Sequence, residues 1–178
     1  MIINEKFFKQ YSPVPLNYNM AELKNYISVA EKIWVRPLIG YELFDEIERQ
    51  VKENKVSETN ATLLTEGGLW QYLSFATVLE GLPMVWSHIS EVGVTKGKSD
   101  NSDSLDLKDM TYVSQHIRNQ VEVLKDQLKK WLCEHSAWYP LMDCCGCGCD
   151  CCQSEAKLNM PNPNFELFST RRKNTDLK

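Results

Sequence analysis

The sequence lacks the short motifs that mark common enzyme classes. It contains no glycine-rich phosphate-binding loop, no H-E-x-x-H motif and no G-x-S-x-G motif. Its three histidines, His88, His116 and His135, lie in separate segments with no acidic partner at a fixed short spacing. Cys133 and His135 are two residues apart, so on a helix they would not face each other as a nucleophile and its base must. We therefore expect a protein that is not an enzyme, with no catalytic and no cofactor-binding residues.

An excess of positive charge and a long uncharged apolar run are also missing. The net charge of -4 and the pI of about 5.5 argue against a protein that grips nucleic acid through its phosphates. Residues 69–89 are largely apolar but include Glu80, Pro83 and His88, so a buried helix explains them better than a membrane span. The first ten residues have no signal-peptide pattern, and we expect synthesis in the cytoplasm.

Helical periodicity dominates the 178 residues, of which 43% are hydrophobic. The pattern predicts a first helix over residues 20–35, capped by Asn19 and stopped by Pro37, and a second helix that carries Leu43 and Phe44. Residues 52–68 look like a loop with at most a short turn at 61–64. A third helix begins at Leu69, central and kinked at 81–83, and a fourth runs from a capping pair at 106 and 109 to about residue 133.

The predicted fold class is therefore all-α, a small bundle of about four main helices in one domain. Residues 1–18, with Phe7, Phe8 and Tyr11 before two prolines, are predicted to be an extended arm that packs on its own core or on a neighbouring copy. Residues 19–141 form the helical domain, with a short β-hairpin or mobile loop near 90–104. Residues 142–152 form a Cys-rich loop, and 153–178 a flexible tail in which Phe165, Leu167 and Phe168 are apolar anchors.

The cysteine run is the one motif with obvious chemistry. Six of the seven cysteines lie in DCCGCGCDCC, where Cys144 and Cys147 form one C-x-x-C pair and Cys149 and Cys152 form a second. Four thiolates could hold a zinc ion, although structural zinc sites usually separate the two pairs by a dozen or more residues. Late disulfides and a reduced, poorly ordered loop are the alternatives. These four cysteines remain weak metal candidates, and no metal or other cofactor is assigned.

The segment FFKQYSPVPLNYNMAELKNYISVAEKIWVRPLIGYELFDEI, residues 7–47, resembles the head-tail connector (adaptor) proteins of tailed bacteriophages, especially those of crAss-like and related phages of Bacteroidetes. The shared pattern is an aromatic arm that ends in proline, a helix closing in AEKIW, then PLIG and an aromatic-rich helix. Weaker support comes from residues 82–83, from the turn at 89–94 and from the last long helix. The resemblance covers roughly residues 5–141.

The resemblance implies a structural virion protein that forms a ring, a dodecamer in this family, under the portal vertex of the capsid. Its expected partners are further copies of itself, the portal protein and other connector or tail ring proteins, with DNA passing through the lumen without specific binding and no membrane contact. The expected location is the virion, reached from the host cytoplasm during assembly. The alternative is a non-catalytic helical adaptor that carries a Cys-rich, zinc-binding loop.

Overall fold

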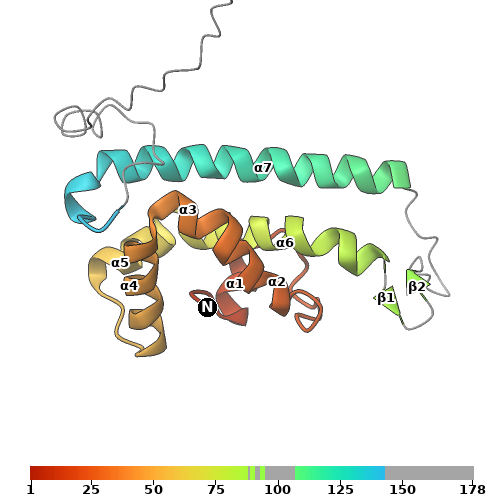
Figure 1. Ribbon diagram of the computed structural model, residues 1–178, viewed down its shortest axis with the longest axis horizontal. Helices are drawn as coiled ribbons and strands as arrows, with labels where there is room; N and C mark the ends of the chain where they lie inside the picture. The colour runs from red at the N-terminus through yellow and green to blue at the C-terminus, as the bar shows by residue number, and fades with distance from the viewer. Residues whose placement is uncertain (88, 91–92, 95–106, 143–178) are drawn as a thin grey trace, which may run out of the picture.

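The computed structural model describes residues 1–87, 89–90, 93–94 and 107–142, and this part of the chain is mostly helical (Figure 1). The all-α prediction is confirmed. The helices are α1 (Glu5–Tyr11), α2 (Lys24–Ala30), α3 (Arg36–Ile39), α4 (Tyr41–Lys52), α5 (Glu58–Thr65), α6 (Leu69–Ser87) and α7 (Leu107–Glu134), with a π-helical turn η1 (Glu31–Val35) and a 3₁₀ turn η2 (Ser136–Trp138). Strands β1 (Ile89–Ser90) and β2 (Gly93–Val94) pair antiparallel.

Helix α6 packs against several other elements. It contacts α1, α2, α5 and α7, and α7 runs alongside it for much of its length (Figure 1). Its apolar side chains point in most directions, so α6 can be covered from several sides, and Leu69, Leu73 and Ala76 are fully buried. With 28 residues, α7 is about 42 Å long at ~1.5 Å per residue. No helix within the described ranges is long and apolar enough to span a membrane.

A π-helical turn carries the chain through Pro37, so the prediction that Pro37 ends the first helix was wrong. Helix α2 continues through η1 into α3, and the backbone N–H of Arg36 donates to the carbonyl of Glu31, five residues earlier. The wider turn accommodates a residue that lacks an N–H and whose ring would crowd the preceding turn. The helical path ends at Gly40, whose φ of 88° lies where other residues are strained.

The N-terminal segment contains a helix, which corrects the prediction of an extended arm. Asn4 caps α1 by accepting a hydrogen bond from the Phe7 N–H at 3.0 Å, a capping signal that the downstream prolines obscured. The aromatic side chains of this segment pack on the chain's own core, and Phe8 is completely buried. Because residues 1–18 pack on their own domain, fewer residues remain that could extend over a neighbouring copy.

Other predicted boundaries shift as well. Helix α5 lies where a loop with at most a short turn was predicted. Ser57 caps this helix by accepting a hydrogen bond from Asn60 N–H at 3.3 Å. Asn19 accepts from Ala21 N–H at 3.1 Å, but the chain turns before α2 begins at Lys24. Helix α6 extends through the predicted kink site at 81–83, with Pro83 inside the helix, as far as Ser87; the kink itself stays a prediction. Residue 106, most of the predicted hairpin near 90–104, the Cys-rich loop beyond Met142 and the tail lie outside the described residues, so those predictions stay predictions.

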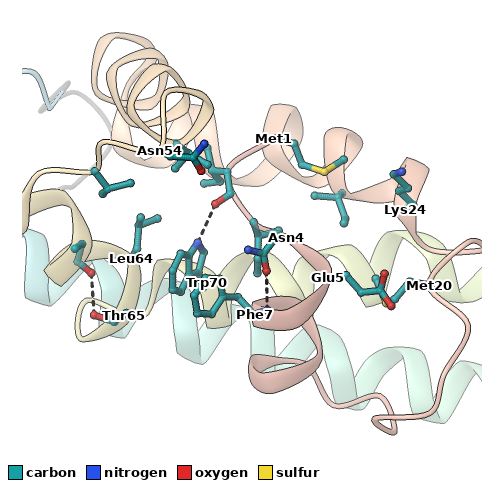
Figure 2. Close-up of a pocket in the computed structure, with 16 residues that line it drawn as sticks. Met1, Asn4, Glu5, Phe7, Met20, Lys24, Asn54, Leu64, Thr65 and Trp70 are labelled. Carbon is teal, nitrogen blue, oxygen red and sulfur yellow. Dashed lines mark hydrogen bonds between the residues drawn. The ribbon is translucent and has the colours of Figure 1, made fainter.

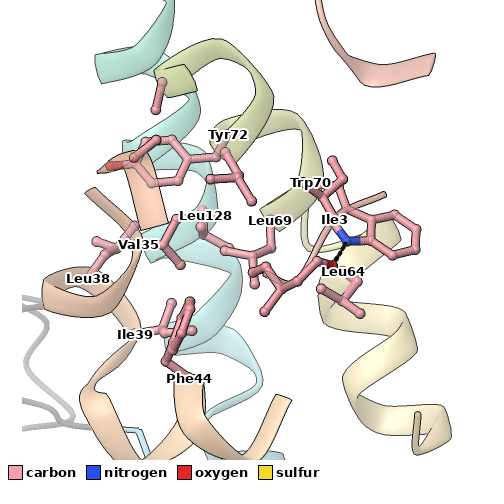
Figure 3. Close-up of a cluster of buried hydrophobic side chains, with 14 of the residues drawn as sticks. Ile3, Val35, Leu38, Ile39, Phe44, Leu64, Leu69, Trp70, Tyr72 and Leu128 are labelled. Carbon is pink, nitrogen blue, oxygen red and sulfur yellow. Dashed lines mark hydrogen bonds between the residues drawn. The ribbon is translucent and has the colours of Figure 1, made fainter. Parts of the chain in front are cut away.

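The core joins the stretch around Pro37 to the two long helices. Val35, Leu38, Ile39 and Phe44 face Leu69, Tyr72 and Leu128 in one continuous apolar cluster (Figure 3). Gly81 allows α2 and α6 to approach closely, because a Cβ there would lie 2.4 Å from Leu23 Cδ2 and 3.1 Å from Tyr26 Cδ2. This core holds two surface features in place, one formed by the N-terminal segment and one at the C-terminal end of α7.

Candidate functional site

The first four residues lie in the body of the domain and are held there by polar contacts to their backbone. Ile2 N–H donates to Glu31 Oε1 at 2.6 Å, and Trp70 Nε1–H donates to the Ile2 carbonyl at 2.9 Å. Ile2 and Ile3 are buried, and Phe7 stacks on Trp70 with a centroid distance of 4.1 Å. Both backbone groups of Ile2 are thus paired inside the protein, where an unpaired group would be costly.

Two carboxylates from different helices converge on the amino group of Met1. That group lies 2.5 Å from Glu48 Oε1 and 3.7 Å from Glu31 Oε2. Hydrogen bonds from the Met1 amino group and from Lys52 lower the pKa of Glu48 to about 2. Glu31 is 5% exposed, and burial raises the pKa of its carboxyl despite the hydrogen bond from Ile2, which acts in the opposite direction. The π-helical turn places Glu31 at this position, consistent with the frequent use of such turns at special sites.

A pocket of about 710 Å³, which we call the N-terminal pocket, opens beside this anchored segment (Figure 2). The N-terminal segment and α1 supply one wall, and α2, the end of α4, α5 and the start of α6 supply the rest. Most of the lining is apolar, as with Met20, Leu64 and Trp70. Lys24 and Glu5 add opposite charges. The volume is in the range of pockets that bind a small molecule or a few side chains.

The C-terminal end of α7 carries a cluster of aromatic rings. The His135 ring stacks on Trp131 at 4.2 Å, and Trp138 lies tilted 4.7 Å from His135. His135 Nδ1 lies 2.8 Å from the Trp131 carbonyl, an oxygen that can only accept, so this nitrogen carries the proton. Tyr139 O–H donates to the Thr59 carbonyl at 2.7 Å, and burial raises its pKa to about 12, which keeps the donor proton in place.

Beside this cluster, large apolar side chains remain exposed at the same end of the molecule. Tyr41 is 60% exposed, Trp138 55% and Leu141 41%. Tyr41 and Leu141 line one shallow depression together with Pro140 and Met142, where the start of α4 meets the chain that follows α7. We call Tyr41, Trp138 and Leu141 the end patch. Trp138 lies two residues before Pro140, which lines the same depression, and exposed large apolar side chains are common on surfaces that contact a partner.

The predicted metal candidates Cys144, Cys147, Cys149 and Cys152 lie outside the described residues. Within the described ranges, no group of three or more His, Cys, Asp or Glu side chains is placed to hold a metal ion. His116 and His135 both lie at α7 or just after it, while His88 is not described. Sequence reasoning missed the role of Glu31. The available signal was its spacing: Glu31 lies four residues after Ile27 and three before Trp34, on an otherwise apolar helical face.

Comparison with protein families identifies the chain at the family level. A model described as a family of unknown function, DUF6712, matches residues 35–152, about two thirds of the chain. The chain belongs to this family. The DUF6712 match begins in the π-helical turn and ends at the last cysteine of the cysteine run, so it includes that run and leaves out the N-terminal segment. No curated protein and no solved structure matches the chain.

Proposed function

We propose that this protein is a structural component of a tailed-bacteriophage virion, a connector whose copies form a ring between the portal vertex and the tail. The sequence pattern of residues 7–47 and the helical architecture support the assignment. In this function the protein would act through the surfaces that contact its neighbours and not through chemically reactive side chains. Ring copies would contact each other head to tail, so that one surface of each copy meets a different surface of the next.

The end patch is the observation that carries the proposal. Tyr41, Trp138 and Leu141 are exposed, and the Trp138 ring lies 4.7 Å from that of His135 in the aromatic cluster at the end of α7. Aromatic side chains on a rigid support lose little conformational freedom on binding and commonly dominate protein interfaces. We assign the end patch to contact with the portal or with the next copy in the ring.

The charge of the chain suits a channel through which DNA moves. A net charge of -4 per copy, repeated around a ring, would repel the phosphate backbone and favour passage over binding. DNA is therefore a passenger in this proposal, without a specific binding site. The protein would act in the virion after assembly in the host cytoplasm.

Electron microscopy of this protein co-expressed with the portal-like product of the same gene cluster tests the proposal. We expect portal rings that carry an added collar with the rotational symmetry of the portal. Portal rings that stay bare at a high excess of the protein would contradict the connector assignment.

A zinc-carrying helical adaptor is the second candidate, favoured by the extent of the DUF6712 match. That match ends at Cys152 and so treats the cysteine run as continuous with the helical domain. Metal analysis of the purified full chain would give about one zinc per chain in this case, lost in a variant with both Cys144→Ser and Cys149→Ser. Equal, sub-stoichiometric metal in both proteins would rule it out.

A further inference from the structure

The N-terminal pocket is open among the described residues, and specific hydrogen bonds and ring contacts hold its walls in place. The backbone of Ile2 is fixed by Glu31 and Trp70, and Phe7 is stacked on the same Trp70. The open space is therefore bounded by side chains that are already held in place, with Met20, Leu64 and Trp70 among its apolar lining. An apolar surface of this kind is stabilised when apolar side chains cover it.

We propose that the N-terminal pocket binds residues 165–168 of this chain's own C-terminal tail, through the side chains of Phe165, Leu167 and Phe168. These three are the densest group of large apolar residues after Met142. The proposal concerns a site separate from the end patch and does not depend on the connector function.

Charge complementarity favours this occupant. Of the side chains that line the pocket, Glu5 is acidic and Lys24 is basic. The ten residues that follow Phe168 contain four basic side chains and one acidic side chain. Lys24, exposed at the pocket, offers a partner of opposite charge to Glu166 between the apolar anchors. Placing Glu166 near Lys24 and the basic extension near Glu5 would orient the segment in one direction.

The segment between Met142 and Phe165 is long enough for residues 165–168 to reach the N-terminal pocket. Met142 lies beside Tyr41 at the start of α4, and Val51 and Asn54 line the N-terminal pocket at and just beyond the other end of this 12-residue helix. The pocket is thus roughly 20 Å away at ~1.5 Å per helical residue. The 22 residues from 143 to 164 span up to about 70 Å when extended, so the segment reaches the pocket of its own copy or of a neighbour.

Photo-cross-linking in the full chain tests the proposal. A benzophenone-bearing phenylalanine analogue replaces Phe165, and cross-linked peptides are mapped by mass spectrometry after irradiation. We expect cross-links to the pocket lining, especially Met20 and Leu64. The same probe at position 177, beyond the basic run, is the matched control and should give no enrichment in these peptides.

Two sets of variants keep the test decisive. Ala61→Phe fills the pocket from α5 and should abolish the cross-links, while Lys24→Glu, on an exposed side chain, should lower their yield about two- to fivefold. Adding Glu166→Lys to Lys24→Glu should restore the yield, an effect that altered folding would not produce. Cross-links to the end patch, or yields that do not respond to the charge reversal and its rescue, would overturn the proposal.

Discussion

The surroundings of Ile2 and the end patch both contain large apolar side chains, but these are buried around Ile2 and exposed in the end patch. Around Ile2, apolar side chains are buried and the polar groups beside them are paired, with Glu31 and Trp70 each bonded to its backbone. At the end patch, Trp138 and Tyr41 expose more than half of their side chains although they belong to or flank rigid helices. The first arrangement stabilises one chain. The second leaves large apolar side chains exposed on the surface, which is why we propose a role in contact for them and a structural role for the residues around Ile2.

The largest effect should come from the buried aromatic side chain of the N-terminal helix. Phe8→Ala removes a fully buried ring from the core and should lower the free energy of unfolding by about 4 kcal/mol. Chemical denaturation followed by circular dichroism measures the change. If α1 were a loosely attached arm, as an arm meant for a neighbour would be, the isolated protein would lose less than about 1 kcal/mol, a typical single-mutation effect.

Glu31→Ala should be the next most damaging change. It leaves the Ile2 N–H without its acceptor and removes one of two carboxylates near the Met1 amino group, and we expect a loss of about 2–3 kcal/mol. Glu31→Gln keeps an acceptor oxygen and serves as the matched control. Equal losses in the two variants would show that the hydrogen bond to Ile2 is not what Glu31 supplies.

Gly81→Ala should destabilise the contact between α2 and α6 by about 1 kcal/mol, because the overlap with Leu23 exceeds the gain in helix preference. Thermal unfolding measures it. In a Leu23→Ala background the 2.4 Å overlap disappears and only the 3.1 Å approach to Tyr26 Cδ2 remains, so the loss caused by the same change should shrink toward zero. A constant effect in both backgrounds would mean that close approach to Leu23 is not the reason for glycine here.

The pH dependence of stability separates the two carboxylates. The folded-state pKa of Glu48 is lowered to about 2, so its contribution is present above the ordinary value of 4.5 and is lost as the pH falls toward 2. Glu48→Gln should therefore lose less stability on acidification than the wild type.

Glu31, with a raised pKa, acts in the opposite sense: its contribution is present below 4.5 and is lost as the pH rises. Melting temperatures of Glu31→Gln, relative to the wild type, should rise with pH.

The sequence predicted the helical class and much of the core, because three-and-four spacing reports burial directly. The errors arose where a local signal was read without its tertiary context. Pro37 normally stops a helix, but the π-helical turn before it accommodates the ring. Asn4 and Ser57 were capping signals at helices too short to show a clear period. The N-terminal site could not be predicted, since Glu31 and Trp70 meet Ile2 from 29 and 68 residues away.

Trp138→Ala should have the smallest effect on stability, within about 0.5 kcal/mol, because its ring is already exposed to solvent. Denaturation under the conditions used for Phe8→Ala provides the comparison. A loss of several kcal/mol would mean that Trp138 holds the end of α7 in place and would remove it from the contact surface.

The central claim, that the end patch joins this protein to a portal assembly, is tested most directly by collar occupancy in electron micrographs. Wild type and Trp138→Ala are each co-expressed with the portal-like product of the same gene cluster, and the fraction of portal rings with a collar is counted. The account predicts collars on most rings with the wild type and few with the variant. Bare rings with the wild type, or equal occupancy for both proteins, would contradict it.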